Sequence, residues 1–181
     1  MIEVRFHGRG GQGAVTSAEL LALAAIIEEK YAQAFPSFGP ERRGAPVLAF
    51  VRTDDKPIRI RADIKEPDVV VVLDPGLLDI VNVTDGLKEN GFLIVNIRKP
   101  PGELKAKYGN RYRVATVDAT AIARETIGVP IVNTTMLGAI LKVTSIVDIS
   151  SLEEPLQERF GDRGSRNFKA CQTAFEKTQV A

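Results

Sequence analysis

The feature that most constrains the fold of this chain is a glycine-rich turn between a short strand pattern and a long apolar run. Residues 2–7 alternate apolar and polar side chains, and residues 16–30 have a helical pattern. Between them lies Gly8-Arg9-Gly10-Gly11-Gln12-Gly13, in which three glycines fit the spacing G-x-G-x-x-G. The first such glycine permits a tight strand-to-helix turn, the second lets another backbone approach, and the third lets the helix pack closely on the strand.

The start of the helix after this turn suits an anion, because free N–H groups and the helix dipole point there and Arg9 adds a cation. The dinucleotide version of the motif expects an acidic residue about 20 positions on, at the end of the second strand. Glu28 and Glu29 lie on the helix instead, and the predicted second strand, residues 31–35, ends without an acid. Two interpretations stay open: a contact to a ligand or a partner chain, or a turn that serves close packing alone.

A second unusual stretch, residues 34–46, holds three prolines and two glycines and predicts an ordered loop. It carries candidate interface residues in a row: Phe38, Glu41, Arg42, Arg43 and Gly44. An aromatic residue beside an arginine pair is the composition enriched at interface anchors. We expect an assembly surface; the alternative is a solvated loop.

The remaining pattern predicts a three-layer α/β/α fold with a mostly parallel, Rossmann-like sheet and an antiparallel hairpin at one edge. Residues 47–52 and 57–61 should form that hairpin, since the second segment alternates apolar and basic residues. Two continuous apolar runs, 68–75 and 91–96, predict central strands covered on both faces. Residues 112–117 predict a further strand. We expect one domain over residues 1–181.

Several polar residues at the ends of these elements have simple structural interpretations. Asp74 precedes Pro75 and should cap the helix that the proline begins; a catalytic role is the alternative, disfavoured because this lone carboxylate has no visible partner. Asp118 should cap the next helix, 119–127. Asn133-Thr134-Thr135 should cap a helix over 134–145, or else offer hydrogen bonds to a neighbour. Residues 98–110 are polar and predict a surface excursion, and two helices should close the chain.

Composition excludes several functions. The 181 residues carry 24 basic and 23 acidic side chains, a balance that indicates neither nucleic acid nor an anionic membrane surface as a partner. The chain begins with a strand pattern rather than a signal peptide and has no run long enough to span a membrane, so we expect a cytoplasmic protein.

The single cysteine, Cys171, cannot ligate an iron–sulfur cluster alone and is expected to be a small buried residue. The single histidine, His7, does not make a zinc site with it. His7 is expected either to be satisfied by a hydrogen bond at the strand end or to make a pH-sensitive contact at the glycine turn. We expect no cofactor or metal bound by this chain alone.

The two unusual stretches together resemble the gamma subunit, or gamma domain, of 2-oxoacid:ferredoxin oxidoreductases. Residues 8–15 are similar to the opening of that family, and residues 35–46 are similar to its second signature, although many members have glycine where this chain has Ala45. The form Arg-Arg-Gly-Ala-Pro looks closest to the pyruvate and 2-oxoisovalerate (branched-chain) enzymes. The resemblance covers nearly the full length, including residues 68–75 and 133–135.

The resemblance implies a non-catalytic subunit of an enzyme that oxidatively decarboxylates a 2-oxoacid and joins the acyl group to coenzyme A, with electrons passing to ferredoxin. It implies alpha, beta and delta subunits as partners, which hold thiamine diphosphate, magnesium and the iron–sulfur clusters. On this basis the residues from Gly8 to Gly13 are expected to contact coenzyme A or a partner chain. Two alternatives stay open, a stand-alone dinucleotide-binding protein and an interaction scaffold without a small-molecule ligand.

Overall fold

The computed structural model describes residues 1–37 and 42–181. Its strands form one seven-stranded sheet in the order β2-β3-β1-β4-β5-β6-β7. The strands are β1 (Ile2–Arg9), β2 (Tyr31–Pro36), β3 (Pro46–Asp54), β4 (Val69–Val72), β5 (Phe92–Asn96), β6 (Arg113–Val117) and β7 (Gln179–Val180). The α-helices are α1 (Ala14–Ile27), α2 (Pro101–Tyr108), α3 (Ala119–Thr126), α4 (Thr135–Val143), α5 (Glu153–Phe160) and α6 (Gly164–Lys177).

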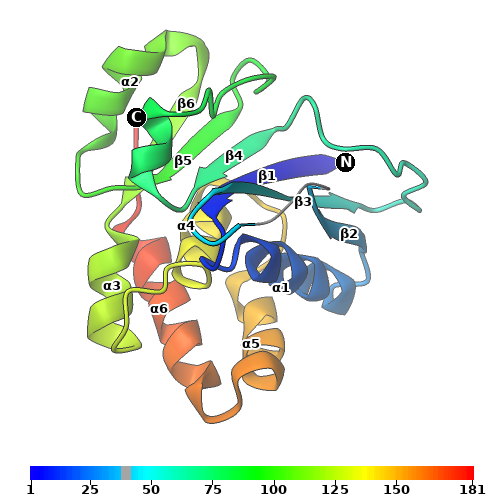
Figure 1. Cartoon of the computed structure of the whole chain (residues 1–181). Coiled ribbons are helices and arrows are strands. Elements are labelled where there is room, and N and C mark those ends of the chain that lie inside the picture. Colours follow the sequence, from blue (N-terminus) through cyan, green and yellow to red (C-terminus); the bar gives the residue numbers. More distant parts are fainter. Residues whose placement is uncertain (38–41) are drawn as a thin grey trace.

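The four central strands β1, β4, β5 and β6 are parallel, and antiparallel strands flank them at both edges. Helices α1, α3, α4, α5 and α6 cover one face, while α2 lies on the opposite face (Figure 1). The larger core lies between the sheet and the first group of helices, and a smaller one, which includes Val70, Leu93 and Leu104, lies under α2. The predicted three-layer α/β/α class with an antiparallel edge is confirmed.

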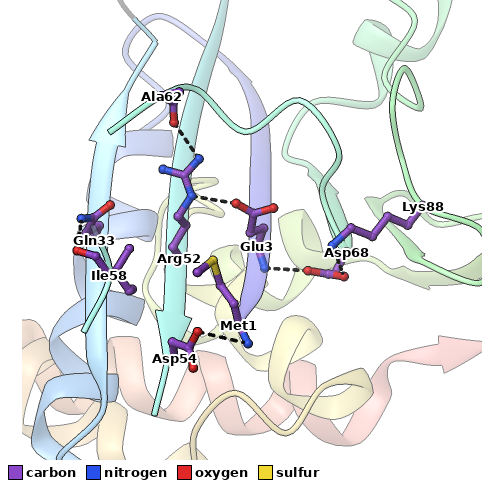
Figure 2. A network of polar contacts seen from close by, with 9 residues as sticks. All are labelled: Met1, Glu3, Gln33, Arg52, Asp54, Ile58, Ala62, Asp68 and Lys88. Carbon is purple, nitrogen blue, oxygen red and sulfur yellow. Dashed lines mark hydrogen bonds and ion pairs between the residues drawn. The ribbon is translucent and has the colours of Figure 1, made fainter. Parts of the chain in front are cut away.

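The predicted hairpin partner of β3 is wrong. Residues 57–61 form no strand, because both edges of β3 are already paired, one with β1 and the other with β2. The segment instead crosses the face of the sheet and is held there by side chains, as Figure 2 shows: Arg52 Nη2 donates to the Ala62 carbonyl at 2.6 Å and Gln33 Nε2 donates to the Ile58 carbonyl at 3.2 Å.

This segment, residues 57–62, which we call the strap, covers a charged side chain in the interior. Arg52 is 2% exposed; its Nε donates to Glu3 Oε1 at 2.7 Å, and its guanidinium lies over the Phe35 ring. Within the described residues its Nη1 has no hydrogen-bond partner. The alternation of basic residues in 57–61 therefore indicates a solvated segment over the partly buried Arg52–Glu3 ion pair rather than one face of a hairpin.

The predicted surface excursion at 98–110 contains a helix, α2. Pro101 stands at its first position, where a proline costs no hydrogen bond, and Leu104 is buried against the smaller core. With two buried residues in eight, the apolar signal of this helix is too weak for its sequence to predict.

Candidate functional site

The glycine-rich turn joins β1 to α1 as the sequence predicts. Gly13 precedes α1 in a left-handed conformation, with φ of 79°, which explains the glycine there. Gln12 closes the turn from inside: its N–H donates to the Arg9 carbonyl at 2.9 Å, and its Oε1 accepts from the Arg9 N–H at 2.7 Å. A Cβ at Gly8 would lie 3.3 Å from both Ala14 and Leu73, so this glycine serves the close packing of the strand end on the helix.

The backbone approach predicted for Gly10 is confirmed, and the approaching backbone belongs to this chain. The Gly10 N–H donates to the Ala45 carbonyl at 2.9 Å, and the Gly44 N–H donates to the Gly10 carbonyl at 3.2 Å. A Cβ at Gly10 would overlap the Arg42 carbonyl oxygen and lie 3.0 Å from its carbonyl carbon. The glycine turn and the proline-rich loop, which the sequence presents as separate motifs, therefore form one unit.

We expect Gly10→Ala to displace residues 42–45 while the core stays folded, because the clash is with loop backbone rather than with a core element. Limited proteolysis should cut the variant faster within residues 36–46, with thermal unfolding remaining cooperative. Gly102→Ala is the matched control, because a Cβ there meets no described atom within 4 Å. Equal proteolysis of the two variants would contradict this reading of Gly10.

Arg9 is engaged by the chain itself rather than left open toward a ligand. Its Nε donates to Asp74 Oδ2 at 2.8 Å, and its Nη1 donates to the Gly44 carbonyl at 3.1 Å. Gln12 Nε2 lies 3.3 Å from the same Asp74 oxygen. The other oxygen, Oδ1, accepts from the Gly76 N–H at 2.8 Å, which confirms the predicted cap of the short 3-10 helix Pro75–Asp79. We call Arg9, Gln12, Asp74 and the loop 42–45 the Asp74 cluster.

The Asp74 cluster lies at the carboxyl ends of β1 and β4. From these neighbouring strands the chain leaves toward opposite faces, since α1 packs in the larger core and Leu77 in the smaller one. This is the switch point where open α/β sheets bind their ligands. In this chain the Arg9–Asp74 ion pair occupies the switch point. The second strand, β2, is an antiparallel edge strand that ends at Pro36 and offers no acidic residue for a ribose. The geometry therefore disfavours the dinucleotide-binding alternative.

The loop presents its arginines outward. Arg42, Arg43 and Gly44 are exposed, and Gly44 has a positive φ of 79°. The other two candidate interface residues, Phe38 and Glu41, lie outside the described residues. Gly11 is the remaining open position of the turn, with φ of 90° and no described atom within 4 Å of a Cβ.

Asn133 supports the glycine turn from the far side, which agrees with the second interpretation of residues 133–135, hydrogen bonds to a neighbour, although the partners were not predicted. Its side chain lies against Gly13, with Nδ2 3.5 Å from the Gly13 carbonyl, and its own carbonyl accepts from Ser17 Oγ at 3.0 Å. The predicted side-chain cap of α4 is wrong, because Thr134 Oγ1 is instead 2.7 Å from Asn167 Oδ1. The polar run 133–135 was the available signal, but its partners lie far away in the sequence.

Both single-copy titratable residues are buried. His7 accepts a hydrogen bond at Nε2 from Arg5 Nε at 3.1 Å, and burial, with the neighbouring Arg5 charge, lowers its pKa to about 3. Of the two interpretations of His7, the structure therefore supports a histidine satisfied by a hydrogen bond. Cys171 is fully buried, as predicted; its Sγ donates to the Thr134 carbonyl, and burial raises its pKa to about 12.

These residues do not fit an iron–sulfur cluster, because the one cysteine is a buried thiol already engaged by a carbonyl. Among residues 1–37 and 42–181 no group of three or more histidine, cysteine, aspartate or glutamate side chains is placed to hold a metal ion. In the same part of the chain, none of the helices has the length and apolar character needed to cross a membrane.

Fold and site together define an α/β protein whose glycine turn has the spacing of nucleotide-binding turns but is hydrogen-bonded to the proline-rich loop of the same chain. The chain belongs to the pyruvate ferredoxin/flavodoxin oxidoreductase family, whose model matches residues 3–177.

It is 60% identical to the pyruvate/ketoisovalerate oxidoreductases common subunit gamma of Thermococcus litoralis, over 99% of this chain and 98% of the relative. It is 53% identical to pyruvate synthase subunit PorC of Methanothermobacter thermautotrophicus, over 99% and 97%. The crystal structure of pyruvate oxidoreductase subunit PORC from Thermotoga maritima superposes with a TM-score of 0.89 at 38% identity, covering 99% of this chain and 98% of that one.

Proposed function

We propose that this chain is the gamma subunit of a pyruvate:ferredoxin oxidoreductase, which decarboxylates pyruvate oxidatively to acetyl-coenzyme A and carbon dioxide and reduces ferredoxin. The whole chain acts as one gamma-type domain. Its relatives of nearly equal length carry the names of gamma and PorC subunits, which supports a subunit role.

One structural observation carries the role within the complex: the backbone of Gly10 is joined to Gly44 and Ala45, so the two signature segments build a single outward surface. On that surface Arg42 and Arg43 are exposed, and arginine makes bidentate contacts to carboxylates. The surface contacts a partner subunit, with alpha, beta and delta chains completing the enzyme. Phe38 and Glu41 belong to the same interface.

The chemistry resides in the partners. The iron–sulfur clusters are assigned to other subunits, because the one cysteine of this chain is a buried thiol that donates to the Thr134 carbonyl. Thiamine diphosphate and magnesium are assigned to other subunits because the resemblance to the oxidoreductase family implies it. Coenzyme A is a substrate of the complex. Contact between coenzyme A and the glycine turn would involve Gly11, the open position, because Gly10 and Arg9 are engaged within the chain.

A second oxoacid has a specific observation in its favour. The relative from Thermococcus litoralis is named as a subunit common to pyruvate and ketoisovalerate oxidoreductases. We therefore propose 2-oxoisovalerate as the alternative substrate of a complex containing this chain. The test is to purify the native complex from its source cell, identify its chains and assay it against a panel of oxoacids. The result distinguishes a chain that serves one pyruvate enzyme from a chain shared with a 2-oxoisovalerate enzyme.

We expect the double variant Arg42→Ala/Arg43→Ala to bind its co-expressed partner subunits at least about tenfold more weakly, because interface arginines are frequent hot spots. The fold should be unaffected, since both side chains are exposed. Arg59→Ala/Arg61→Ala is the matched control: it removes the same charge from two exposed positions in the strap. Assembly measured at low protein concentration decides the matter, and equal affinities for the two double variants would refute the proposed surface.

A further inference from the structure

The Asp74 carboxylate connects three segments that lie far apart in the sequence. Oδ2 accepts from Arg9 in the glycine turn, Oδ1 accepts from Gly76 after β4, and Arg9 reaches on to the Gly44 carbonyl in the proline-rich loop. We infer that Asp74 is a positioning residue for the assembly surface: acting through Arg9, it sets the geometry of residues 42–45 and hence of the Arg42–Arg43 pair. This inference rests on the proposed function, in which that pair meets a partner subunit.

The loop is held to the turn from two sides. On one side the Gly10 backbone exchanges hydrogen bonds with Gly44 and Ala45. On the other side the Arg9 guanidinium donates to the Gly44 carbonyl at 3.1 Å. A guanidinium has a rigid fork of donors, so fixing one nitrogen fixes the direction of the others. With Nε held by Asp74 at 2.8 Å, Nη1 is directed at Gly44.

Asp74 is the member of the cluster whose loss releases the others. Without the carboxylate, the Arg9 side chain, about a third exposed, has no anionic partner among the described residues and gains more by turning toward water. Gly44 would then keep only its backbone link to Gly10. Because the Asp74–Arg9 pair is itself partly exposed, this release should cost the fold little while changing the surface that the loop presents.

The ion pair also determines which charges the partner meets. Asp74 neutralises Arg9, so the positive charge of this surface comes from Arg42 and Arg43 alone among the described members of the cluster. The chemistry that matches two exposed guanidinium groups is an acidic patch of carboxylates on the partner subunit. Arg9 therefore positions the loop and does not bind an anionic ligand.

The test compares two capping aspartates at the same edge of the sheet. Asp118 follows β6 and accepts from the Ala121 N–H at 2.9 Å, as Asp74 accepts from Gly76, but it makes no contact with the Asp74 cluster among the described residues. Asp74→Ala and Asp118→Ala should lower the midpoint of thermal unfolding similarly. Only Asp74→Ala should weaken assembly with co-expressed partner subunits, by about tenfold, a smaller factor than the loss of a hot spot itself because the arginine pair stays in place. Equal assembly of the two variants would overturn the inference.

Asp74→Asn separates the cap from the positioning role. Asparagine caps as well as aspartate, so thermal stability should return. With the amide oxygen in the Oδ1 position facing Gly76, the amide nitrogen takes the Oδ2 position and faces Arg9 Nε, which is also a donor, so the Arg9 link is lost and assembly should stay weak. Assembly restored to that of the unaltered chain would show that only the cap matters and would overturn the inference.

A double variant tests whether Asp74 acts through Arg9. Arg9→Ala/Asp74→Ala should assemble no worse than either single variant, because both changes break the same link. Additive losses would mean that Asp74 acts independently of Arg9, contrary to the inference. If Arg42→Ala/Arg43→Ala assembles normally, the assembly surface in the proposed function fails; if it assembles weakly while Asp74→Ala assembles normally, only the role of Asp74 fails.

Discussion

Gly138→Ala is expected to destabilise this protein by about 3 kcal/mol, the upper part of the usual range for overpacking a core. Gly138 lies in the buried face of α4, and a Cβ there would overlap the Cys171 carbonyl oxygen of α6 and lie 2.7 Å from its carbonyl carbon. Backbone atoms cannot rotate away as a side chain does. The two helices must therefore separate, and the small residues that line α6, Ala170, Cys171 and Ala174, would lose their close contact.

Thermal unfolding measures this effect. For a domain of this size each kcal/mol lowers the midpoint by roughly 2–4 °C, so a fall of about 6–12 °C is expected. Gly102→Ala is again the control, because it lies in the first turn of α2 with open space around it and gains from the better helix propensity of alanine. A Gly138 variant as stable as this control would show that α4 and α6 can part at no cost.

Acidification is expected to produce the second large effect, through His7. Its pKa in the folded chain is about 3, below the ordinary value of 6.5, because burial and the Arg5 guanidinium both oppose a charged imidazole. Between these two pKa values His7 therefore binds a proton in the unfolded chain but not in the folded chain. Stability contributed by neutral His7 is fully present above pH 6.5 and is lost as the pH falls from 6.5 toward 3. At about 1.4 kcal/mol for each pKa unit, the loss reaches at most about 5 kcal/mol.

His7→Gln isolates this contribution from the other titrating groups. Glutamine keeps an oxygen that can accept from Arg5 Nε but takes up no proton in this range. Denaturant unfolding of both forms at pH 7.5, 5.5 and 4 should show the unaltered chain losing more stability per pH unit than the variant. Parallel curves would mean that His7 finds a partner for its second proton when it is charged.

The sequence by itself was sufficient wherever a few neighbouring residues dictate the backbone. The glycine spacing predicted the strand–turn–helix, because glycine adopts without strain the left-handed conformation found at Gly13. The apolar runs predicted the central strands β4 and β5, and aspartate before a helix start predicted the caps at Asp74 and Asp118. The resemblance carried by the two unusual stretches likewise predicted the family.

Local patterns were insufficient wherever one pattern suits two environments. The alternating residues 57–61 have the period of a half-exposed strand, yet they form a strap, because pairing also requires a free edge and β3 has none. Asp74 looked like a lone carboxylate with a capping role. Its second role depends on Arg9, which is 65 positions away and adjacent to it only through the parallel pairing of β1 with β4.

The sequence thus determined the glycine turn, the proline-rich loop and the family to which both belong. The tertiary structure alone decided that these two segments touch, with the Arg42 carbonyl occupying the space that Gly10 leaves open and Asp74 holding Arg9 toward Gly44. The physical reason is range: a turn or a cap depends on interactions within about four residues, whereas a contact between distant segments exists only after the sheet has placed their backbones side by side.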